Sequence, residues 1–173
     1  MRDILVIDTS ILCVWLDIPG KETCGTADDL WDRTRVARFF EIEERRGTLF
    51  VLPLAAIIET GNHIAQSRKA WECAIALCEI IMKSLDSTSP WVEFSQQDVL
   101  WSRTNLSKLI SDWPEYAKAK FSIGDMTIRF VAEFYSEMGY DVHIFTGDAG
   151  LKSYEPATKP LIPRRRLDKA NKR

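Results

Sequence analysis

Two acidic residues follow apolar segments at opposite ends of the chain. The apolar run at residues 4–7 ends at Asp8, and the run at 142–145 leads through Thr146 and Gly147 to Asp148. In an open parallel α/β sheet, ligands bind outside the carboxyl ends of the strands. If both runs are strands of such a sheet, we expect Asp8 and Asp148 to border one site.

Two further acids stand near the starts of predicted helices. Asp125 lies in the first turn of a helix that begins in SIGD at Ser122, and Glu59 lies in the second turn of a helix that opens at Pro53. Helices that connect parallel strands run back antiparallel to them, so their first turns lie at the same edge as the carboxyl ends of the strands. The sequence thus predicts that all four carboxylates converge on one rim.

A cluster of carboxylates is tolerated when a cation lies between them, and oxygen ligands suit the hard cations Mg²⁺ and Mn²⁺. Two such ions can activate a water and stabilise the leaving oxygen of a phosphodiester. We predict that the four acids are both the catalytic residues and the metal ligands. Support would come from neighbouring polar side chains, namely Thr9, Ser10, Thr146 and Asn62.

The same acids also have purely structural interpretations. Asp8 could cap the turn that follows it, Asp125 could stabilise its helix through the helix dipole, and Asp148 in TGDAG could form a turn. Glu59 could be a solvated helix residue. Taken one at a time these interpretations stay open, and the shared predicted edge is the argument for a site.

The elements that must position these acids alternate between strands and helices. Strands are predicted at residues 4–7, 48–52, 91–94, 141–145 and 159–162. Helices are predicted at 10–16, 30–46, from 53 onward, 70–85, 95–111 and 122–139, with a polar loop at 17–29 and breaks at 87–90 and 113–114. Alternation of this kind predicts an α/β fold with a mainly parallel sheet and helices on both faces.

The composition fits one such domain. The chain has 173 residues, 46% of them hydrophobic, and a net charge of −2. We expect a domain at residues 1–163 and a basic tail at 164–173, where six Lys or Arg stand against one Asp. No apolar stretch approaches the ~18 residues that span a bilayer, and no signal-peptide pattern precedes the first strand, so we expect a cytoplasmic protein without membrane association. The four cysteines and two histidines match no zinc pattern.

Four segments together resemble the PIN-domain nucleases. The order of their acids, Asp–Glu–Asp–Asp, is similar to the pattern of that family. The segments are ILVIDTSIL with Asp8, LPLAAIIETGNHI with Glu59, SIGDMTIRFVAEF with Asp125, and VHIFTGDAGL with Asp148. The resemblance extends loosely over residues 3–162, and its specificity lies in the combination.

The resemblance implies a three-layer α/β/α fold and cleavage of RNA that depends on Mg²⁺ or Mn²⁺. It also implies that Asp8, Glu59, Asp125 and Asp148 hold the metal directly or through water. Many relatives are VapC-type toxins that a small antitoxin restrains, and many form homodimers, so an antitoxin or other regulatory protein and a second copy are expected partners. The chain is longer than those toxins, in the loop at 17–29, between residues 70 and 111, and in the tail.

Basic residues could help to bind RNA. The tail residues Arg164, Arg165 and Arg166 could attract nucleic-acid phosphates, although a solvated tail is the simpler interpretation. Arg129 could contact substrate as well, although it lies four residues before Glu133 and an i,i+4 salt bridge is the simpler expectation.

Two other functions remain open at this point. An inactive scaffold with the same fold could bind RNA or protein without cutting. A phosphatase of the haloacid dehalogenase type would also place an Asp at the end of the first strand, but it needs a second Asp two residues later. That position is Ser10. We therefore rank the nuclease first and the phosphatase last.

Overall fold

The computed structural model describes residues 2–157 of the chain. The strand predicted at 159–162 and the basic tail with Arg164, Arg165 and Arg166 lie outside the described residues. The elements follow one another in the order β1 (Asp3–Ile7), α1 (Thr9–Trp15), β2 (Thr23–Thr26), β3 (Asp29–Asp32), α2 (Arg33–Arg46), β4 (Leu49–Val51), α3 (Leu54–Ala65), α4 (Ala70–Leu85), the 3₁₀ helix η1 (Phe94–Trp101), α5 (Arg103–Lys118), α6 (Ile123–Glu137), β5 (Asp141–Phe145) and α7 (Ala149–Lys152).

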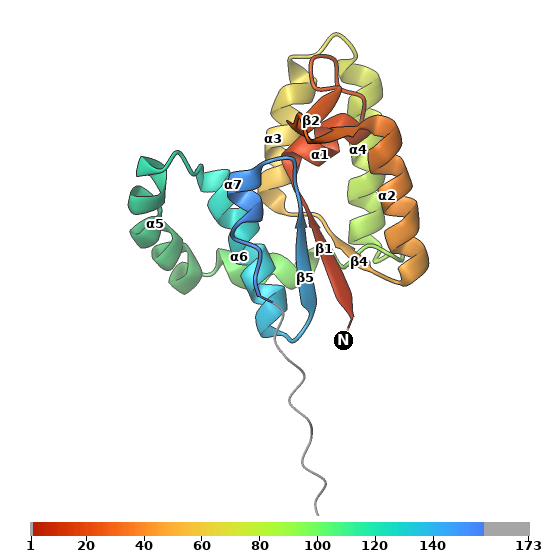
Figure 1. The fold of residues 1–173 in the computed structure, drawn as a ribbon. Helices are drawn as coiled ribbons and strands as arrows, with labels where there is room; N and C mark the ends of the chain where they lie inside the picture. Colours follow the sequence, from red (N-terminus) through yellow and green to blue (C-terminus); the bar gives the residue numbers. More distant parts are fainter. Residues whose placement is uncertain (1, 158–173) are drawn as a thin grey trace, which may run out of the picture.

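A parallel sheet of three strands lies at the centre of the fold, in the order β4-β1-β5 (Figure 1). In β1, Ile4 pairs with Leu49 on one side and with Val142 on the other. The ladder continues one residue beyond β1, because the amide of Asp8 donates to the carbonyl of Phe145 at 3.0 Å. The predicted α/β class and parallel sheet are confirmed, and the ends of β1 and β5 lie side by side.

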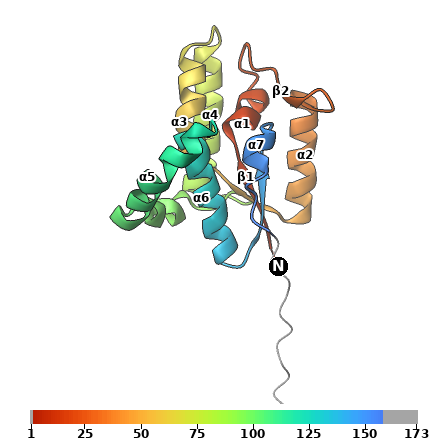
Figure 2. The same cartoon turned by 60° about the vertical axis from the view of Figure 1, so that its left-hand side comes forward.

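Helices cover both faces of this sheet, because successive side chains of a strand point to opposite faces. Ile4 and Val6 of β1 pack into a buried cluster with residues of α5 and α6. Leu5 and Ile7 pack into a second cluster with residues of α1, α2, α3 and α4. Figures 1 and 2 show α5 and α6 on one side of β1 and β5, and α2 on the other.

The region predicted as a loop and the start of a helix forms an antiparallel hairpin instead. β2 and β3 pair from Thr23 opposite Asp32 to Thr26 opposite Asp29, so the predictions of a loop at 17–29 and a helix from residue 30 are wrong there. The hairpin needs a left-handed residue, which Gly25 supplies with φ +94°. Helix α2 begins only at Arg33, because Asp32 caps it by accepting from the amide of Arg35 at 2.8 Å.

The segment between α4 and α6 also differs from the prediction. Of the strand expected at 91–94, only an isolated parallel bridge from Trp91 to Phe50 forms, and η1 follows. The break expected at 113–114 is wrong, since α5 runs through Pro114. Proline lacks the N–H that would bond the carbonyl four residues earlier, here that of Ile110. Ile110 is 64% exposed, so water can reach this part of the helix.

Within the described residues β5 is an edge strand, and side chains from the end of α7 and the segment after it cover part of its edge. The amide of Ile144 donates to Oε2 of Glu155 at 2.6 Å, and Nζ of Lys152 donates to the carbonyl of Ile144 at 2.9 Å. Glu155 also pairs with Nδ1 of His143 at 3.2 Å. These contacts satisfy backbone groups that an open edge would leave unpaired.

The helices in residues 2–157 are all too short or too polar to cross a bilayer.

Candidate active site

The four predicted acids border one pocket of about 310 Å³ at the carboxyl edge of the parallel sheet. They come from four separate places in the chain: Asp8 between β1 and α1, Glu59 in α3, Asp125 in the first turn of α6, and Asp148 before α7. The geometric expectation that these carboxylates share a rim is therefore confirmed. The lining consists of Asp8, Thr9, Ser10, Cys13, Lys21, Thr23, Cys24, Glu59, His63, Asp125 and Asp148.

Asp8 is the most buried of the four acids, with 6% of its surface exposed. Its Oδ2 accepts hydrogen bonds from Oγ of Ser10 at 2.6 Å and from Oγ1 of Thr146 at 2.7 Å. The amide of Ser10 donates to the same oxygen at 3.3 Å, which makes Asp8 the N-cap of α1. These bonds fix the orientation of the carboxylate.

Burial raises the pKa of Asp8 above its usual value, although the hydrogen bonds from Ser10 and Thr146 act in the opposite direction. A buried carboxylate whose pKa is raised is an electrostatic cost to the fold at neutral pH. Costs of this kind are typical of functional sites, where a ligand or cation supplies the compensating charge.

Thr146 connects the ends of the two strands. Besides donating to Asp8, its Oγ1 accepts from the amide of Asp148 at 2.9 Å. The amide of Gly147 donates to Oγ of Ser10 at 3.0 Å. The predicted supporting residues Ser10 and Thr146 thus hold Asp8 and the TGD turn together, across 138 residues of sequence in the case of Thr146 and Asp8.

Glu59 is held by an element remote from its own helix. Oγ1 of Thr9 donates to Oε2 of Glu59 at 2.9 Å, which gives Thr9 the predicted supporting contact. On the other side, the carboxylate lies against Gly124 in the first turn of α6, where a Cβ atom would come within 2.9 Å of Cδ of Glu59. The absence of a side chain at position 124 therefore makes room for Glu59.

Asp125 and Asp148 have local roles in addition to their place at the pocket. Asp125 completes the predicted capping box with Ser122, since each backbone amide donates to the side chain of the other, at 2.8 and 3.0 Å. Oδ1 of Asp148 accepts from the amide of Gly150 at 2.6 Å and caps α7. The structural interpretation of Asp8 as a cap is thus confirmed, and Asp125 and Asp148, which were expected to favour the helix dipole and to form a turn, contribute to helix capping as well. Glu59 caps no helix, so its position at the pocket lacks such an explanation.

The donor set is suitable for a hard divalent cation, but the ligand shell is open. The pocket offers carboxylate and hydroxyl oxygens, which Mg²⁺ and Mn²⁺ prefer. Among residues 2–157, no three His, Cys, Asp or Glu groups are gathered tightly enough to hold a metal ion as the side chains stand. Mg²⁺ keeps several waters and uses one or two carboxylates, so an open rim of oxygen donors fits it better than a closed cage.

The β2–β3 hairpin forms one wall of the pocket, which the sequence had not revealed. Thr23 and Cys24 line the pocket, and Lys21 just before β2 adds a cation to it. The hairpin approaches the TGD turn so closely that a Cβ at Gly147 would lie 2.6 Å from the amide nitrogen of Gly25. Burial raises the pKa of Cys24 and raises that of Cys13 to about 11, so both are protonated at neutral pH and neither is activated as a nucleophile.

His63 also lines the pocket and was missed. The sequence held a signal for it, since His63 lies four residues after Glu59 and shares its helix face. Asn62, which was predicted to support Glu59, is exposed and is not part of the lining. Helical spacing allows either position to share the face of Glu59, and the structure places position 63 at the pocket.

Arg129 is occupied elsewhere. Its Nε donates to Oε1 of Glu133 at 2.8 Å, which confirms the simpler expectation of an i,i+4 pair. Its guanidinium lies over the rings of Tyr116 and Tyr154, at 5.0 and 5.1 Å from the ring centroids. Arg129 is not part of the pocket lining.

Comparisons with models of protein families, with curated proteins and with solved structures found no match.

Proposed function

We propose that the chain is a metal-dependent endoribonuclease that hydrolyses RNA phosphodiester bonds in the acidic pocket. The observation that carries this proposal is the position of Glu59. Asp8, Asp125 and Asp148 are accounted for by capping, but Glu59 is brought to the same rim by Thr9 and by the space at Gly124. A fold without a use for clustered negative charge gains nothing from a fourth carboxylate there.

The four acids would bind the cation from two kinds of element. Asp8 and Asp148, joined through Thr146, would hold a divalent cation from the strand ends, and Glu59 and Asp125 would do so from the helices. Mg²⁺ or Mn²⁺, when bound, would neutralise the phosphate and activate a water for attack on phosphorus. Lys21 on the rim would attract the phosphate backbone.

The sequence resemblance suggests four further properties that we propose for the chain. These are a PIN-like three-layer arrangement, RNA as the substrate, a cytoplasmic location, and a regulatory protein such as an antitoxin. The fold supports the first of these as far as it shows helices on both faces of a parallel sheet. The phosphatase alternative lacks its second carboxylate, because the residue two positions after Asp8 is Ser10, whose hydroxyl donates to Asp8.

Cleavage of labelled RNA and single-stranded DNA panels, with Mn²⁺ and with EDTA, tests the proposal. The wild-type protein should cut RNA with Mn²⁺ and not with EDTA, and Glu59→Gln should lose at least about 100-fold, in the range seen when an electrostatic catalytic group is removed. Asp98→Asn, at an exposed acid outside the pocket, is the matched control and should cut normally. RNA binding without cleavage and without Mn²⁺ binding would establish the scaffold instead.

A further inference from the structure

Helix α4 has two mainly apolar stripes with the same spacing on opposite sides. The inner stripe consists of buried residues at intervals of four, three and four, namely Cys73, Leu77, Ile80 and Ser84. The outer stripe repeats the pattern two residues earlier and extends it, with Trp71, Ile75, Cys78, Met82 and Leu85. Two residues correspond to about 200° around a helix, so the stripes face away from each other. Alternating intervals of four and three are those of a helix that packs against another helix.

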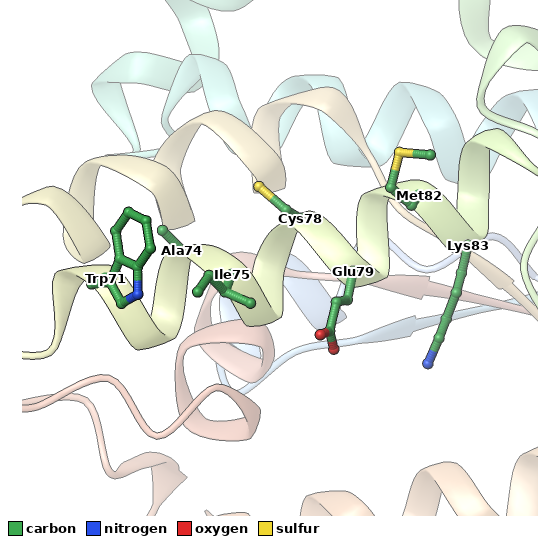
Figure 3. A pocket seen from close by; sticks show the side chains of 7 residues that line it. All are labelled: Trp71, Ala74, Ile75, Cys78, Glu79, Met82 and Lys83. Atoms are coloured by element: carbon green, nitrogen blue, oxygen red, sulfur yellow. The ribbon is translucent and has the colours of Figure 1, made fainter.

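The outer stripe is uncovered in the described structure. Trp71 is 76% exposed, Ile75 45%, Met82 51% and Leu85 52%, and Cys78 is exposed as well. A shallow hollow of about 580 Å³ runs along the stripe from Trp71 to Met82, and Figure 3 shows the side chains that line it following one helix from Trp71 to Lys83. Single exposed apolar residues are normal, but a continuous patch of large ones marks an interaction surface.

We propose that the outer stripe of α4 packs antiparallel against the same stripe of a second copy of the chain, about a two-fold axis at Cys78. The stripe is nearly symmetric about that residue. A two-fold axis there places Trp71 opposite Leu85 of the second copy and Ile75 opposite Met82, while Cys78 faces its own counterpart. A surface that is complementary to itself in this way fits a symmetric dimer.

The charges beside the stripe favour the antiparallel direction. Glu72 and Lys83 flank the same side of the stripe, six residues before and five residues after Cys78. At ~1.5 Å per residue they lie ~9 and ~7.5 Å from the axis, so each Glu72 meets a Lys83 of the second copy. In a parallel pair in register, Glu72 and Lys83 of one copy would instead lie on the opposite side of the interface from those of the other copy, so they could not pair.

Glu79 distinguishes the proposed register from a non-specific apolar contact. It is exposed, lies one residue from Cys78 on the side of Glu72 and Lys83, and therefore approaches its own counterpart at the axis. Like charges in that position oppose association. Glu79→Gln should therefore tighten the dimer by severalfold, whereas removal of an acid from an unrelated patch should not.

Analytical ultracentrifugation of the full chain up to about 0.1 mM tests the interface. The wild-type chain should form a dimer, Met82→Lys should be monomeric, and Glu79→Gln should dimerise at lower concentration than wild type. Ile110→Lys, at an exposed apolar residue on α5, is the matched control and should stay dimeric. Circular dichroism should be the same for all four proteins, because each substituted side chain is exposed.

Oxidation with diamide tests the axis. Two Cys78 thiols at a two-fold axis should each lose a hydrogen to diamide and form a disulfide-linked dimer, which Cys78→Ser abolishes and Cys24→Ser retains. Cys13 and Cys73 are buried and cannot substitute for Cys78. A monomeric wild-type chain, a dimer that survives Met82→Lys, or a dimer without the Cys78 link would each overturn the proposal. If the wild-type chain is a monomer, the outer stripe of α4 would instead be a contact surface for a different protein.

Discussion

The carboxylate of Glu59 occupies the space that a side chain at position 124 would need. Glu59 belongs to α3 and Gly124 to the first turn of α6, and a Cβ atom at Gly124 would collide with Oε1 of Glu59. The glycine therefore lets a carboxylate from one helix lie against the beginning of another. A side chain at position 124 should therefore displace the carboxylate of Glu59 without unfolding the protein, because the colliding atom is the flexible end of a side chain.

We expect Gly124→Ala to keep the fold and lose the activity. Alanine is more favourable than glycine inside a helix by ~1 kcal/mol, which offsets the movement of Glu59. The displaced carboxylate would leave Thr9, to which it is bonded at 2.9 Å. Thermal unfolding should therefore change by no more than about 4 °C, while Mn²⁺-dependent RNA cleavage should fall about tenfold or more.

Gly61→Ala is the matched control for that change. Gly61 is also helical, and a Cβ there would meet nothing within 4 Å. It should raise stability by up to ~1 kcal/mol and leave cleavage unchanged. Equal cleavage by the Gly124→Ala and Gly61→Ala proteins would show that the position of Glu59 does not matter for activity.

Asp8→Asn should abolish cleavage and stabilise the protein in the absence of metal. The asparagine oxygen can still accept from Ser10 and Thr146, and the cost of a buried charge is removed. We expect a gain of about 1 kcal/mol, which is ~2–4 °C for a chain of this size. Differential scanning fluorimetry with EDTA measures it, and Asp98→Asn, at an exposed acid, should show no shift. A destabilised Asp8→Asn protein would contradict this account of the buried carboxylate.

Divalent metal should shift the same two proteins differently. A ligand that binds only the folded state raises the free energy of unfolding by about 2.7 kcal/mol at 100 times its Kd. Mn²⁺ should therefore raise the melting temperature of the wild-type chain and of Asp98→Asn, and should do so much less for Asp8→Asn. An equal shift in all three proteins would place the metal elsewhere.

The site was predictable where it depends on the ends of regular elements. Asp8 and Asp148 follow short apolar strands, and the geometry of a parallel sheet brings such ends together without knowledge of side-chain packing. Asp125 was predictable for a similar reason, because the capping box in SIGD fixes where its helix begins. The position of Glu59 at the site was predicted only from the helix start at Pro53 and from the resemblance.

The hairpin was not predictable from local pattern. Its strands are mostly exposed, so they show no alternation of buried and exposed positions. It is stabilised by contacts far along the chain, including the close approach of Gly25 and Cys24 to Gly147. The continuation of α5 through Pro114 was missed for the opposite reason, because a strong local signal was outweighed by the helix around it.

Gly147→Ala should move the hairpin away from the pocket. A Cβ there would lie 2.6 Å from the backbone nitrogen of Gly25 and 2.7 Å from Sγ of Cys24, and a backbone atom cannot move alone. Overpacking of this kind costs about 1–3 kcal/mol, which urea unfolding would measure. In a Cys78→Ser background, maleimide should also label Cys24 faster. Unchanged labelling and unchanged stability would show that the hairpin is not seated on the TGD turn.

Glu155 should make stability depend on pH in the acid range. Burial alone would raise its pKa, but hydrogen bonds from His143, Lys152 and the amide of Ile144 outweigh burial and lower the pKa from 4.5 to about 2. The stabilisation is complete above pH 4.5 and is lost as the pH falls toward 2, because the unfolded chain then binds a proton that the folded chain does not. It amounts to at most about 3 kcal/mol, less what solvent screening removes.

Glu155→Gln should lower the free energy of unfolding at pH 7 by about 1–3 kcal/mol and flatten its decline below pH 4.5. Glu115→Gln, at an exposed acid paired with Lys118, should leave both unchanged. The hydrogen bond that His143 makes to Glu155 is also the largest cause that raises the pKa of His143 above 6.5, so the stabilisation by charged His143 is present below pH 6.5 and lost as the pH rises through that pKa. An NMR titration should therefore show the pKa of His143 falling in Glu155→Gln. An unshifted His143 would mean that Glu155 protects the edge of β5 through Ile144 and Lys152 alone.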